Sequence, residues 1–558
     1  MTSRPKPAAA AGDAVAQASR ALSAATILVK QVEEKVASLC QRNGSLDMAA
    51  LDRHQTEAHG LAWMVSYLEI LNATLAWAQD LDEKGMLGRL PTLLLQIGFG
   101  EYLAQIGHGI AMSQDEIVRP DRYGLTEASR AFLDHADVAA LCAVSVSARP
   151  ELIALLRQAG PAAVVDASDA NDETAALIRS QFRALADEKI APFAPAWHDD
   201  NQLIPIDTIA ELGQLGVFGL TTPSAFGGSE MGAEAMCVVT EELSRGYIGV
   251  GSLGTRSEIA CELIRLAGTE EQKQCLLPKL ASGEILPTAV FTEPNNGSDL
   301  ANLTTRAERV GDVYRIHGAK TWITHASRTD MMILLARTGS PDSGHRGLTM
   351  FLAEKPRGTE EDPFPAKGMT GSEINVLGYR GMREYELSFD GFEVPAANAL
   401  GGKEGEGFRQ LMTTFELARI QTAARALGVA QNAYELGFTY ACERIQFAKP
   451  LIEFPRVFGK LAWMAVEQNM VRQLVKSVAR LKETGVRCDV EAGMAKLVAA
   501  RLAWSCADNA LQIHGGNGYA IEFPISRVLC DARILNIFEG AAEIQAHIIA
   551  RGLLGRGK

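Results

Sequence analysis

Hydrophobic and polar positions follow three successive patterns along the chain. Residues 1–170 carry apolar residues at helical spacing, most clearly at 57–84 and 90–106, and the helical pattern continues from 172 to about 286. From about 287 to 398 it gives way to short runs of alternating apolar and polar residues between Gly, Pro, Asp and Ser clusters, which predicts β-strands. The helical period then returns and continues to the C-terminus.

These patterns predict an α+β protein of several domains. We expect an all-helical N-terminal extension, a helical domain, a middle β domain that is a small barrel or sandwich, and a C-terminal four-helix bundle, at 1–170, 171–286, 287–398 and 399–558. The first boundary is placed at a passage rich in Gly, Ala and Asp near 160–172. The last part should hold three long helices, at 405–443, 456–484 and 489–513, and the third should end at Gly515 and Gly516.

The length of 558 residues and the 47% hydrophobic content allow three or four domains, each with its own core. No run approaches the roughly 18 apolar residues of a membrane span. Pro7 and Asp13 interrupt the N-terminal MTSRPKPAAAAGDAVAQ, which we interpret as an Ala-rich tail. A transit peptide is the alternative, because this tail contains Arg and Ser and few acids.

The net charge argues against one class of binding partner, and the cysteine content indicates the cellular compartment. A net charge of -13 argues against a nucleic-acid partner, which would require clustered Lys and Arg. The nine cysteines include no C-x-x-C pair, so neither a disulfide framework nor a metal site such as zinc is predicted. We therefore expect a cytoplasmic protein.

One glutamate near the C-terminus stands in an unusual place. Glu539 lies in ILNIFEGAAEIQ, after two large apolar residues and before Gly540. Gly costs roughly 1 kcal/mol relative to Ala inside a helix, so this run is not simply a helix. A carboxylate in apolar surroundings is a candidate base, because desolvation raises the pKa of a carboxyl group.

Two stretches of the β region combine turn residues with aromatic and hydroxyl side chains. FTEPNNGSD, at 291–299, is by itself an ordinary turn. KTWITHA, at 320–326, is predicted as a strand in which Trp322 and Thr324 point to the same face. An indole and a hydroxyl so placed could flank a flat ring, although a half-buried strand would use the same residues.

Three further stretches place polar residues on or next to helices. Arg444 and Phe447 in ERIQF are three apart at a helix end and should share a face, although a surface salt-bridging arginine would look the same. Glu416 and Arg419 in FELAR have the same spacing and, alone, suit a solvated ion pair. LQIHGGNGYAIEFP offers the Gln512 amide and two glycines, which admit a ligand or simply end the helix. These glycines follow no strand, so no Rossmann site is predicted.

In this order and spacing, the motifs of 172–558 resemble those of the acyl-CoA dehydrogenase family. The resemblance implies the family fold and an enzyme that desaturates an acyl-CoA between its α and β carbons. It implies FAD as the cofactor and electron-transfer flavoprotein as the electron acceptor. It also implies a homodimer or a higher homo-oligomer, because family members contact the FAD of a neighbouring subunit.

The resemblance assigns expected roles to individual residues. Those beside the flavin are Phe291, Thr292, Trp322 and Thr324, with Ser298 near the pyrophosphate or the CoA arm. Those that reach the neighbouring subunit's FAD are Arg444, Phe447, Gln512, Gly515 and Gly516. Glu416 and Arg419 bracket the CoA arm.

The resemblance also makes Glu539 the base that removes the α-proton. Some family members carry the base beside the arginine that matches Arg419, but Ala418 holds that position here. Backbone N–H groups, including that of Glu539, are expected to polarise the thioester carbonyl. Three positions depart from the family pattern and are not assigned as FAD contacts: Pro455, Ala541 and Glu543.

The wall expected near the acyl group is polar. Its helix, GSLGTRSEIACELI at 251–264, contains Arg256 and Glu258, whereas a long acyl chain would need apolar side chains there. A guanidinium fork matches a carboxylate, so Arg256 is expected to bind a substrate carboxylate, with an ordinary surface arginine as the alternative. The extension and the overall pattern resemble family members that act on a short branched dicarboxylic acyl-CoA.

Other functions fit the same motifs. One is another short-chain or glutaryl-type dehydrogenase. Others of a different class are an acyl-CoA oxidase or flavin monooxygenase on the same fold, and a non-catalytic CoA-binding protein.

Overall fold

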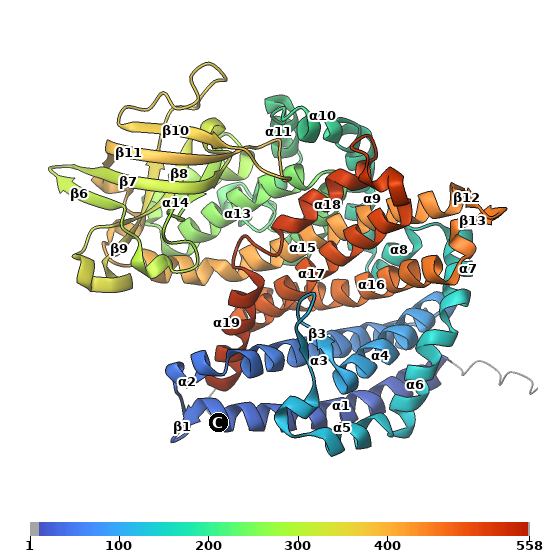
Figure 1. The fold of residues 1–558 in the computed structure, drawn as a ribbon. Coiled ribbons are helices and arrows are strands. Elements are labelled where there is room, and N and C mark those ends of the chain that lie inside the picture. Colours follow the sequence, from blue (N-terminus) through green and yellow to red (C-terminus); the bar gives the residue numbers. More distant parts are fainter. Residues whose placement is uncertain (1–10, 556–558) are drawn as a thin grey trace, which may run out of the picture.

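A computed structural model describes residues 11–555, which form two mostly helical regions separated along the sequence by one curled sheet, and the sheet lies at one end of the molecule (Figure 1). The expected tail lies partly in residues 1–10, outside the described residues. Its remainder is not a tail, because the first helix begins at Ala11 and buries Ala14, Val15 and Ala18. Alanine favours helix, and these positions recur at helical spacing.

The N-terminal extension is helical, as predicted. Its helices are α1 (Ala11–Cys40), α2 (Met48–Arg53), α3 (Gln55–Glu83), α4 (Arg89–His108), α5 (Thr126–Leu133), α6 (Ala136–Ser147), α7 (Arg149–Ala159) and α8 (Ala163–Asp169). Two short hairpins interrupt them, β1 (Gln41–Arg42) with β2 (Ser45–Leu46) and β3 (Ile110–Ala111) with β4 (Ile117–Val118). The Gly-, Ala- and Asp-rich passage contains α8, in which Val164 and Ser168 are fully buried.

Six further helices lie between the extension and the sheet. They are α9 (Glu173–Lys189), α10 (Ala194–Asp199), α11 (Ile206–Gln214), α12 (Gly232–Gly246), α13 (Ile248–Ala267) and α14 (Glu270–Ser282). Helix α13 packs against α12, α14 and the first strand of the sheet. It therefore carries Arg256 between the helical layer and the sheet.

The middle region is one mixed sheet of seven strands, not two stacked sheets. The strands are β5 (Pro287–Val290), β6 (Arg306–Val310), β7 (Val313–Thr324), β8 (Met331–Arg337), β9 (Leu348–Glu354), β10 (Met369–Ile374) and β11 (Glu384–Pro395). Their order is β10-β11-β7-β6-β8-β5, with β9 also paired to β8. Strand β8 is buried along its whole length, whereas β11 alternates between buried and exposed residues, as a strand with one solvated face does.

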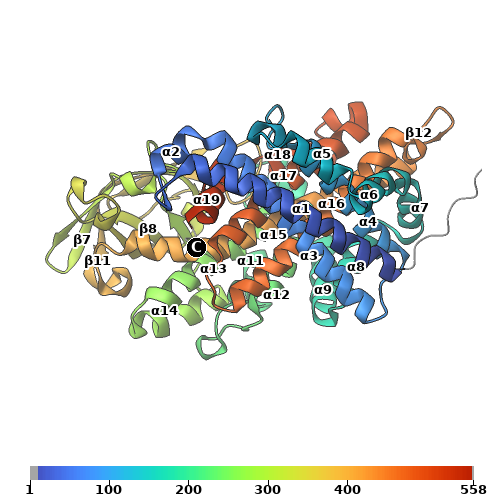
Figure 2. The same ribbon diagram turned by 90° about the horizontal axis from the view of Figure 1, so that it is seen from below.

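The C-terminal region consists of long helices, as predicted. They are α15 (Gly407–Glu443), α16 (Pro455–Glu483) and α17 (Asp489–His514), followed by α18 (Pro524–Ile534) and α19 (Ala542–Gly555). A short hairpin of β12 (Ile445–Gln446) and β13 (Lys449–Pro450) joins α15 to α16. In both views this hairpin lies at the opposite end of the molecule from the sheet (Figures 1 and 2).

The extension packs on the C-terminal helices, with α3 against α16 and α19 (Figure 1). The Tyr102 hydroxyl on α4 donates to Glu467 of α16 at 3.0 Å. Gln41 Nε2 donates to the Leu554 carbonyl of α19 at 2.7 Å. The extension thus contacts the helix that follows Glu539.

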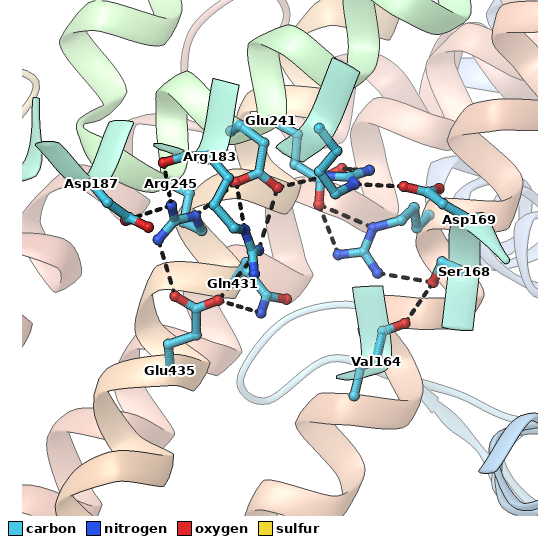
Figure 3. A network of polar contacts seen from close by, with 12 residues as sticks. Val164, Ser168, Asp169, Arg183, Asp187, Glu241, Arg245, Gln431 and Glu435 are labelled. Carbon is cyan, nitrogen blue, oxygen red and sulfur yellow. Dashed lines mark hydrogen bonds and ion pairs between the residues drawn. The ribbon is translucent and has the colours of Figure 1, made fainter. Parts of the chain in front are cut away.

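A buried network of charged side chains joins the end of the extension to the helices that follow it (Figure 3). Arg179 on α9 donates to Asp169 of α8 at 2.6 Å, and to Glu242 and Glu241 of α12 at 2.7 and 3.1 Å. The other cations bonded to these carboxylates are Arg183, Arg245, Arg472 and Lys476. Since a buried charge is tolerated only when paired, the network fixes α8 against α9, α12 and α16.

No single helix within residues 11–555 is long and apolar enough to cross a membrane, although the bent pair α6 and α7 passes that test by length and composition.

Candidate active site

Glu539 lies in a tight turn between α18 and α19. Its φ is 53° and that of Gly540 is 91°, so two successive residues adopt left-handed conformations. Glycine is favoured at 540, because other residues are strained at this φ and a Cβ there would lie 2.2 Å from Gln545 Nε2, so that side chain would have to move. The turn therefore points the Glu539 side chain in a direction that neither a continuous helix nor a strand would give.

Two fully buried side chains bond the backbone of this turn. Lys496 Nζ on α17 donates to the Gly540 carbonyl at 2.6 Å. Gln545 Nε2 on α19 donates to the carbonyls of Glu539 and Gly540 at 3.0 and 3.3 Å. Because a strained backbone persists only when its surroundings hold it, these bonds fix the position of Glu539.

The Glu539 carboxylate contacts cations and a hydroxyl, so the apolar surroundings expected from the sequence are wrong. Arg425 Nη2 on α15 donates to Glu539 Oε2 at 2.6 Å, and the Thr422 hydroxyl donates to the same oxygen. Arg256 Nη1 on α13 lies 3.7 Å from Glu539 Oε1. The apolar neighbour Phe538 packs under Arg425, whose guanidinium carbon lies 4.8 Å from the ring centre.

The Arg256 side chain is only 11% exposed and is bonded within the protein, so the alternative of an ordinary surface arginine is wrong. Its Nη2 donates to Thr324 Oγ1 at 2.9 Å and to the Tyr379 hydroxyl at 3.1 Å. Tyr379 in turn donates to Ser252 Oγ at 2.7 Å, and Arg425 Nη1 donates to the same oxygen at 2.7 Å. A continuous chain of contacts therefore holds the two guanidiniums on either side of the Glu539 carboxylate.

The site carries a surplus of positive charge. Burial lowers the pKa of Lys496 to about 7 and raises the pKa of Glu384, which accepts from Thr324 at 3.1 Å, to about 7. The guanidiniums of Arg256 and Arg425 face one carboxylate, that of Glu539, which favours an anionic ligand.

Two guanidinium nitrogens support the same conclusion. Arg256 Nη1 and Arg425 Nε are buried, and neither has a hydrogen-bond partner within the described part of the chain. A buried N–H without a partner is costly, and a bound carboxylate would supply one.

The turn at 291–299 and strand β7 lie side by side, because the Thr321 amide donates to the Thr292 carbonyl at 3.0 Å. The regular alternation predicted for β7 is wrong at Trp322, where a bulge gives a φ of 60° and leaves the indole 57% exposed while Thr324 is buried. Phe291 and Thr292 are half-buried and Ser298 is exposed. A large exposed indole beside a loop with a free face fits a flat aromatic cofactor.

The predicted residues of ERIQF and LQIHGGNGY lie elsewhere. Helix α15 ends at Glu443, so Arg444 and Phe447 do not share a helical face, and Phe447 occupies the hairpin turn with 89% exposure. Gln512, Gly515 and Gly516 are exposed at the end of α17. Within one chain the hairpin is far from the sheet, so it does not join the Thr292 and Trp322 region (Figure 2).

Glu416 and Arg419 are buried, so a solvated ion pair is wrong for them. Glu416 accepts from Lys482 at 3.0 Å and from the Cys488 amide at 3.2 Å. Arg419 donates to the Asp489 carbonyl at 3.4 Å. Glu258 on the Arg256 helix is also buried and accepts from the Thr221 hydroxyl.

Sequence reasoning missed most of the residues around Glu539. They are Ser252, Tyr379, Thr422, Arg425, Lys496 and Gln545. One signal was available, because Arg425 interrupts the apolar run TAARALGVA of a long helix. The others come from separate elements and carry no local pattern.

Comparisons with known proteins agree with this arrangement. The acyl-CoA dehydrogenase N-terminal, middle and C-terminal domain models match residues 172–284, 288–392 and 405–554. The chain is 57% identical to the (2S)-methylsuccinyl-CoA dehydrogenase of Cereibacter sphaeroides over 97% of this chain and 98% of that protein. It is 34% identical to the glutaryl-CoA dehydrogenase of Desulfococcus multivorans over 68% of this chain and 96% of that protein.

Solved structures give the same result. A glutaryl-coenzyme A dehydrogenase in complex with glutaryl-CoA matches with a TM-score of 0.65 and 33% identity, over 69% of this chain and 96% of that one. The butyryl-CoA dehydrogenase of Megasphaera elsdenii matches with a TM-score of 0.63 and 32% identity, over 68% and 98%. The chain therefore belongs to the acyl-CoA dehydrogenase family, whose members are flavoproteins that oxidise CH–CH bonds, and carries an additional helical region ahead of the family domains.

Proposed function

We propose that this acyl-CoA dehydrogenase converts (2S)-methylsuccinyl-CoA to mesaconyl-CoA. The observation that carries the proposal is the position of the Glu539 carboxylate between two guanidiniums, that of the buried Arg425 and that of the partly buried Arg256. A substrate with a second carboxylate would balance the positive surplus of this site, whereas a purely apolar acyl group would leave it uncompensated. The similarity to a (2S)-methylsuccinyl-CoA dehydrogenase along nearly the whole chain supports the same substrate.

Glu539 is the base in this proposal. It takes the proton from the α-carbon of the thioester, whose acidity is too low for a carboxylate in water. The left-handed turn held by Lys496 and Gln545 keeps the base and its own backbone N–H in fixed positions. That N–H is proposed to bind the thioester oxygen, on which negative charge develops as the proton leaves.

The chemistry that FAD supplies when bound is acceptance of a hydride from the β-carbon. In one subunit we propose four residues beside the flavin: Phe291, Thr292, Trp322 and Thr324. Five exposed residues of a second copy of the chain would complete the FAD site: Arg444, Phe447, Gln512, Gly515 and Gly516. A homodimer is then the smallest complete assembly, and electron-transfer flavoprotein is the proposed acceptor.

Three residues are proposed for the CoA arm. Ser298 is exposed at the loop beside β7, and Glu416 and Arg419 lie on α15, fewer than three turns from Arg425. Arg419 is buried and, within residues 11–555, makes one hydrogen bond, of 3.4 Å, to a carbonyl, so its guanidinium has further donors for a ligand.

The test is flavin reduction without oxygen. The purified yellow protein is mixed with methylsuccinyl-CoA, succinyl-CoA, butyryl-CoA and glutaryl-CoA in turn, and flavin absorbance is followed. Rapid bleaching by methylsuccinyl-CoA and slow or no bleaching by the others is expected. Faster bleaching by butyryl-CoA or glutaryl-CoA would overturn the substrate assignment while leaving the family assignment intact.

A further inference from the structure

Glu384 is a buried carboxyl group that the proposed reaction does not use. It is 6% exposed and begins β11, where it lies opposite Thr324 at the end of β7. Paired residues of an antiparallel sheet place their side chains on the same face. The Thr324 hydroxyl therefore reaches this carboxyl group and donates to Glu384 Oε2 at 3.1 Å. One hydrogen bond thus joins a buried acid to a residue of the proposed cofactor site.

The charged groups around Glu384 leave it without a cation of its own. Arg256, on α13, donates its Nη2 to the threonine hydroxyl at 2.9 Å rather than to the carboxyl group. Arg383, the preceding residue, forms its ion pair with Glu373 of β10 at 3.4 Å. His325, the residue after β7, is neutral, because burial lowers the pKa of its imidazole to about 3. Among the described residues, Glu384 is bonded to the threonine hydroxyl and to no cation.

These surroundings allow Glu384 to hold a proton near neutral pH. Burial raises the pKa of the carboxyl group to about 7, although the hydrogen bond from Thr324 and the charge of Arg256 act in the opposite direction. A flavin bound beside Thr324 would remove more water from the site and raise this pKa further. The neutral form of Glu384 is therefore well populated at pH 7.

The protonation state of Glu384 decides where the Thr324 hydroxyl proton points. A hydroxyl group has one proton and two lone pairs, and the Arg256 Nη2 donor takes one of these lone pairs. An ionised Glu384 can only accept, so the hydroxyl proton turns toward it. A protonated Glu384 donates to the second lone pair instead. Thr324 is buried, so its freed hydroxyl proton then needs an acceptor on a bound ligand.

We propose that Glu384 is a positioning residue that sets the direction of the Thr324 hydroxyl by holding or releasing one proton. With the proton held, the hydroxyl donates to an acceptor at the edge of the bound flavin. With the proton released to solvent, the hydroxyl turns back to the carboxylate. Hydrogen bonds to the ring atoms of a flavin change its electronic properties, so the proton on Glu384 controls them. The inference rests on the proposed cofactor site and not on the proposed substrate.

A pH titration of the oxidised, FAD-loaded protein without substrate tests the inference. Two signals are recorded from about pH 5 to about pH 9, which spans the raised pKa of Glu384. Infrared difference spectra follow protonated carboxyl groups, and visible absorbance follows the flavin. The proteins compared are the parent, Glu384→Gln, Thr324→Val, Thr324→Ser and Glu258→Gln.

Glu258 supplies the matched control. It is 1% exposed, accepts from the Thr221 hydroxyl, and has its pKa raised to about 7 by burial. It is therefore the same kind of group as Glu384, but its hydroxyl partner is not a residue of the proposed cofactor site. Glu258→Gln should remove its own infrared component and leave the flavin titration of the parent intact.

In the parent, the flavin spectrum and one carboxyl band should change with the same midpoint, at about pH 7 or above. In Glu384→Gln, this band should be absent and the flavin change should fall below about one tenth of the parent amplitude, because an amide does not titrate. Thr324→Val should likewise abolish the flavin change while the carboxyl group still titrates. Thr324→Ser should restore it, because serine keeps the hydroxyl.

Three results would overturn the inference. One is a flavin change that persists in Glu384→Gln, since another group would then cause it. Another is a parent flavin spectrum that stays constant while the Glu384 band titrates. If Glu384→Gln does not retain FAD, equal flavin titrations in Thr324→Ser and Thr324→Val would overturn it as well.

Failure of the proposed function is distinguishable from failure of this inference. If the titrations are as expected but methylsuccinyl-CoA does not reduce the flavin, only the proposed substrate is wrong. If methylsuccinyl-CoA reduces the flavin but Glu384→Gln leaves the pH titration unchanged, only the role of Glu384 is wrong. A parent protein that binds no FAD would overturn both the cofactor site and this inference.

Discussion

Replacing Arg179 by methionine should destabilise the junction between the extension and the family domains. Arg179 is 5% exposed and donates to Asp169, Glu241 and Glu242, which are themselves buried. Methionine has a similar length and no charge, so it fills the space and removes only the cation. Three buried carboxylates would then face one another with fewer partners.

The pKa values of two of these carboxyl groups set the size of the effect. Burial raises the pKa of Asp169, but the charges of Arg179 and Lys476 outweigh it and hold the value at about 2. For Glu242, Arg179, Arg183 and Arg245 likewise outweigh burial, and its pKa is about 2. At 1.4 kcal/mol per pKa unit these shifts correspond to about 2 and about 3 kcal/mol, and other cations share them. Arg179→Met should therefore cost about 3 kcal/mol at pH 7.

The pH dependence has a definite sign. Because the pKa values of Asp169 and Glu242 are lower in the folded protein, the stability they contribute is present above about pH 4.5 and is lost as the pH falls toward 2. In Arg179→Met these pKa values rise, so protonation relieves the repulsion at a higher pH. The cost of the substitution should stay nearly constant between pH 7 and pH 5 and should shrink as the pH falls from 5 toward 2.

Urea unfolding followed by tryptophan fluorescence measures this cost, since Trp63 and Trp77 lie on α3 of the extension. Protein and FAD concentrations are kept constant, because ligand binding and assembly shift the transition. Arg20→Met is the matched control, because its ion pair with Asp137 is on the surface and Arg20 is 59% exposed. A midpoint for Arg179→Met equal to that of Arg20→Met, or a cost that does not shrink between pH 5 and pH 3, would refute the reasoning.

Three further substitutions test the site. Lys496→Met removes an ammonium whose pKa is lowered to about 7 by burial. Because this pKa is lower in the folded protein than in the unfolded chain, the parent should be more stable by about 2 kcal/mol at pH 9 than at pH 7. The urea midpoint of the variant should not show this rise. Arg256→Gln should lower kcat/KM for methylsuccinyl-CoA about 100-fold, which corresponds to roughly 3 kcal/mol. It should lower kcat/KM for 2-methylbutyryl-CoA, which lacks the second carboxylate, less than about threefold. Equal losses for the two substrates would argue against carboxylate binding by Arg256. Gly540→Ala should retain FAD but slow flavin reduction at least about tenfold, because its Cβ would lie 2.2 Å from Gln545 Nε2; an unchanged rate would show that the turn need not be so tight.

Long periodic segments were predictable because their pattern is local. The helix expected at 405–443 is α15 (Gly407–Glu443), and the helix expected at 489–513 is α17 (Asp489–His514). The strand order was not predictable, since pairs such as β5 with β8 depend on contacts between distant segments. The bulge at Trp322 was not predictable either, because strand periodicity assumes regular alternation.

For the candidate site, individual residues could likewise be predicted from the sequence, but their arrangement in space could not. Glu539 was recognisable from its immediate neighbours, as a carboxylate in an otherwise apolar run, whereas Arg256 was singled out because the family resemblance places its helix beside the acyl group. Their mutual proximity was not recognisable, because α13 and the Glu539 turn are separated by almost 300 positions, and both lie against α15. For this reason the expected apolar surroundings of Glu539 proved to be a pair of guanidiniums.

The most direct test of the account is the rate of flavin reduction in Glu539→Gln. The variant is loaded with FAD, mixed with methylsuccinyl-CoA in an anaerobic stopped-flow instrument, and compared with the parent. The account predicts retained FAD, tight binding of the CoA thioester and a reduction rate lowered by about a thousandfold or more, since a positioned base contributes roughly 10²–10⁴. A rate within about threefold of the parent would contradict it, because Glu539 could not then be the base.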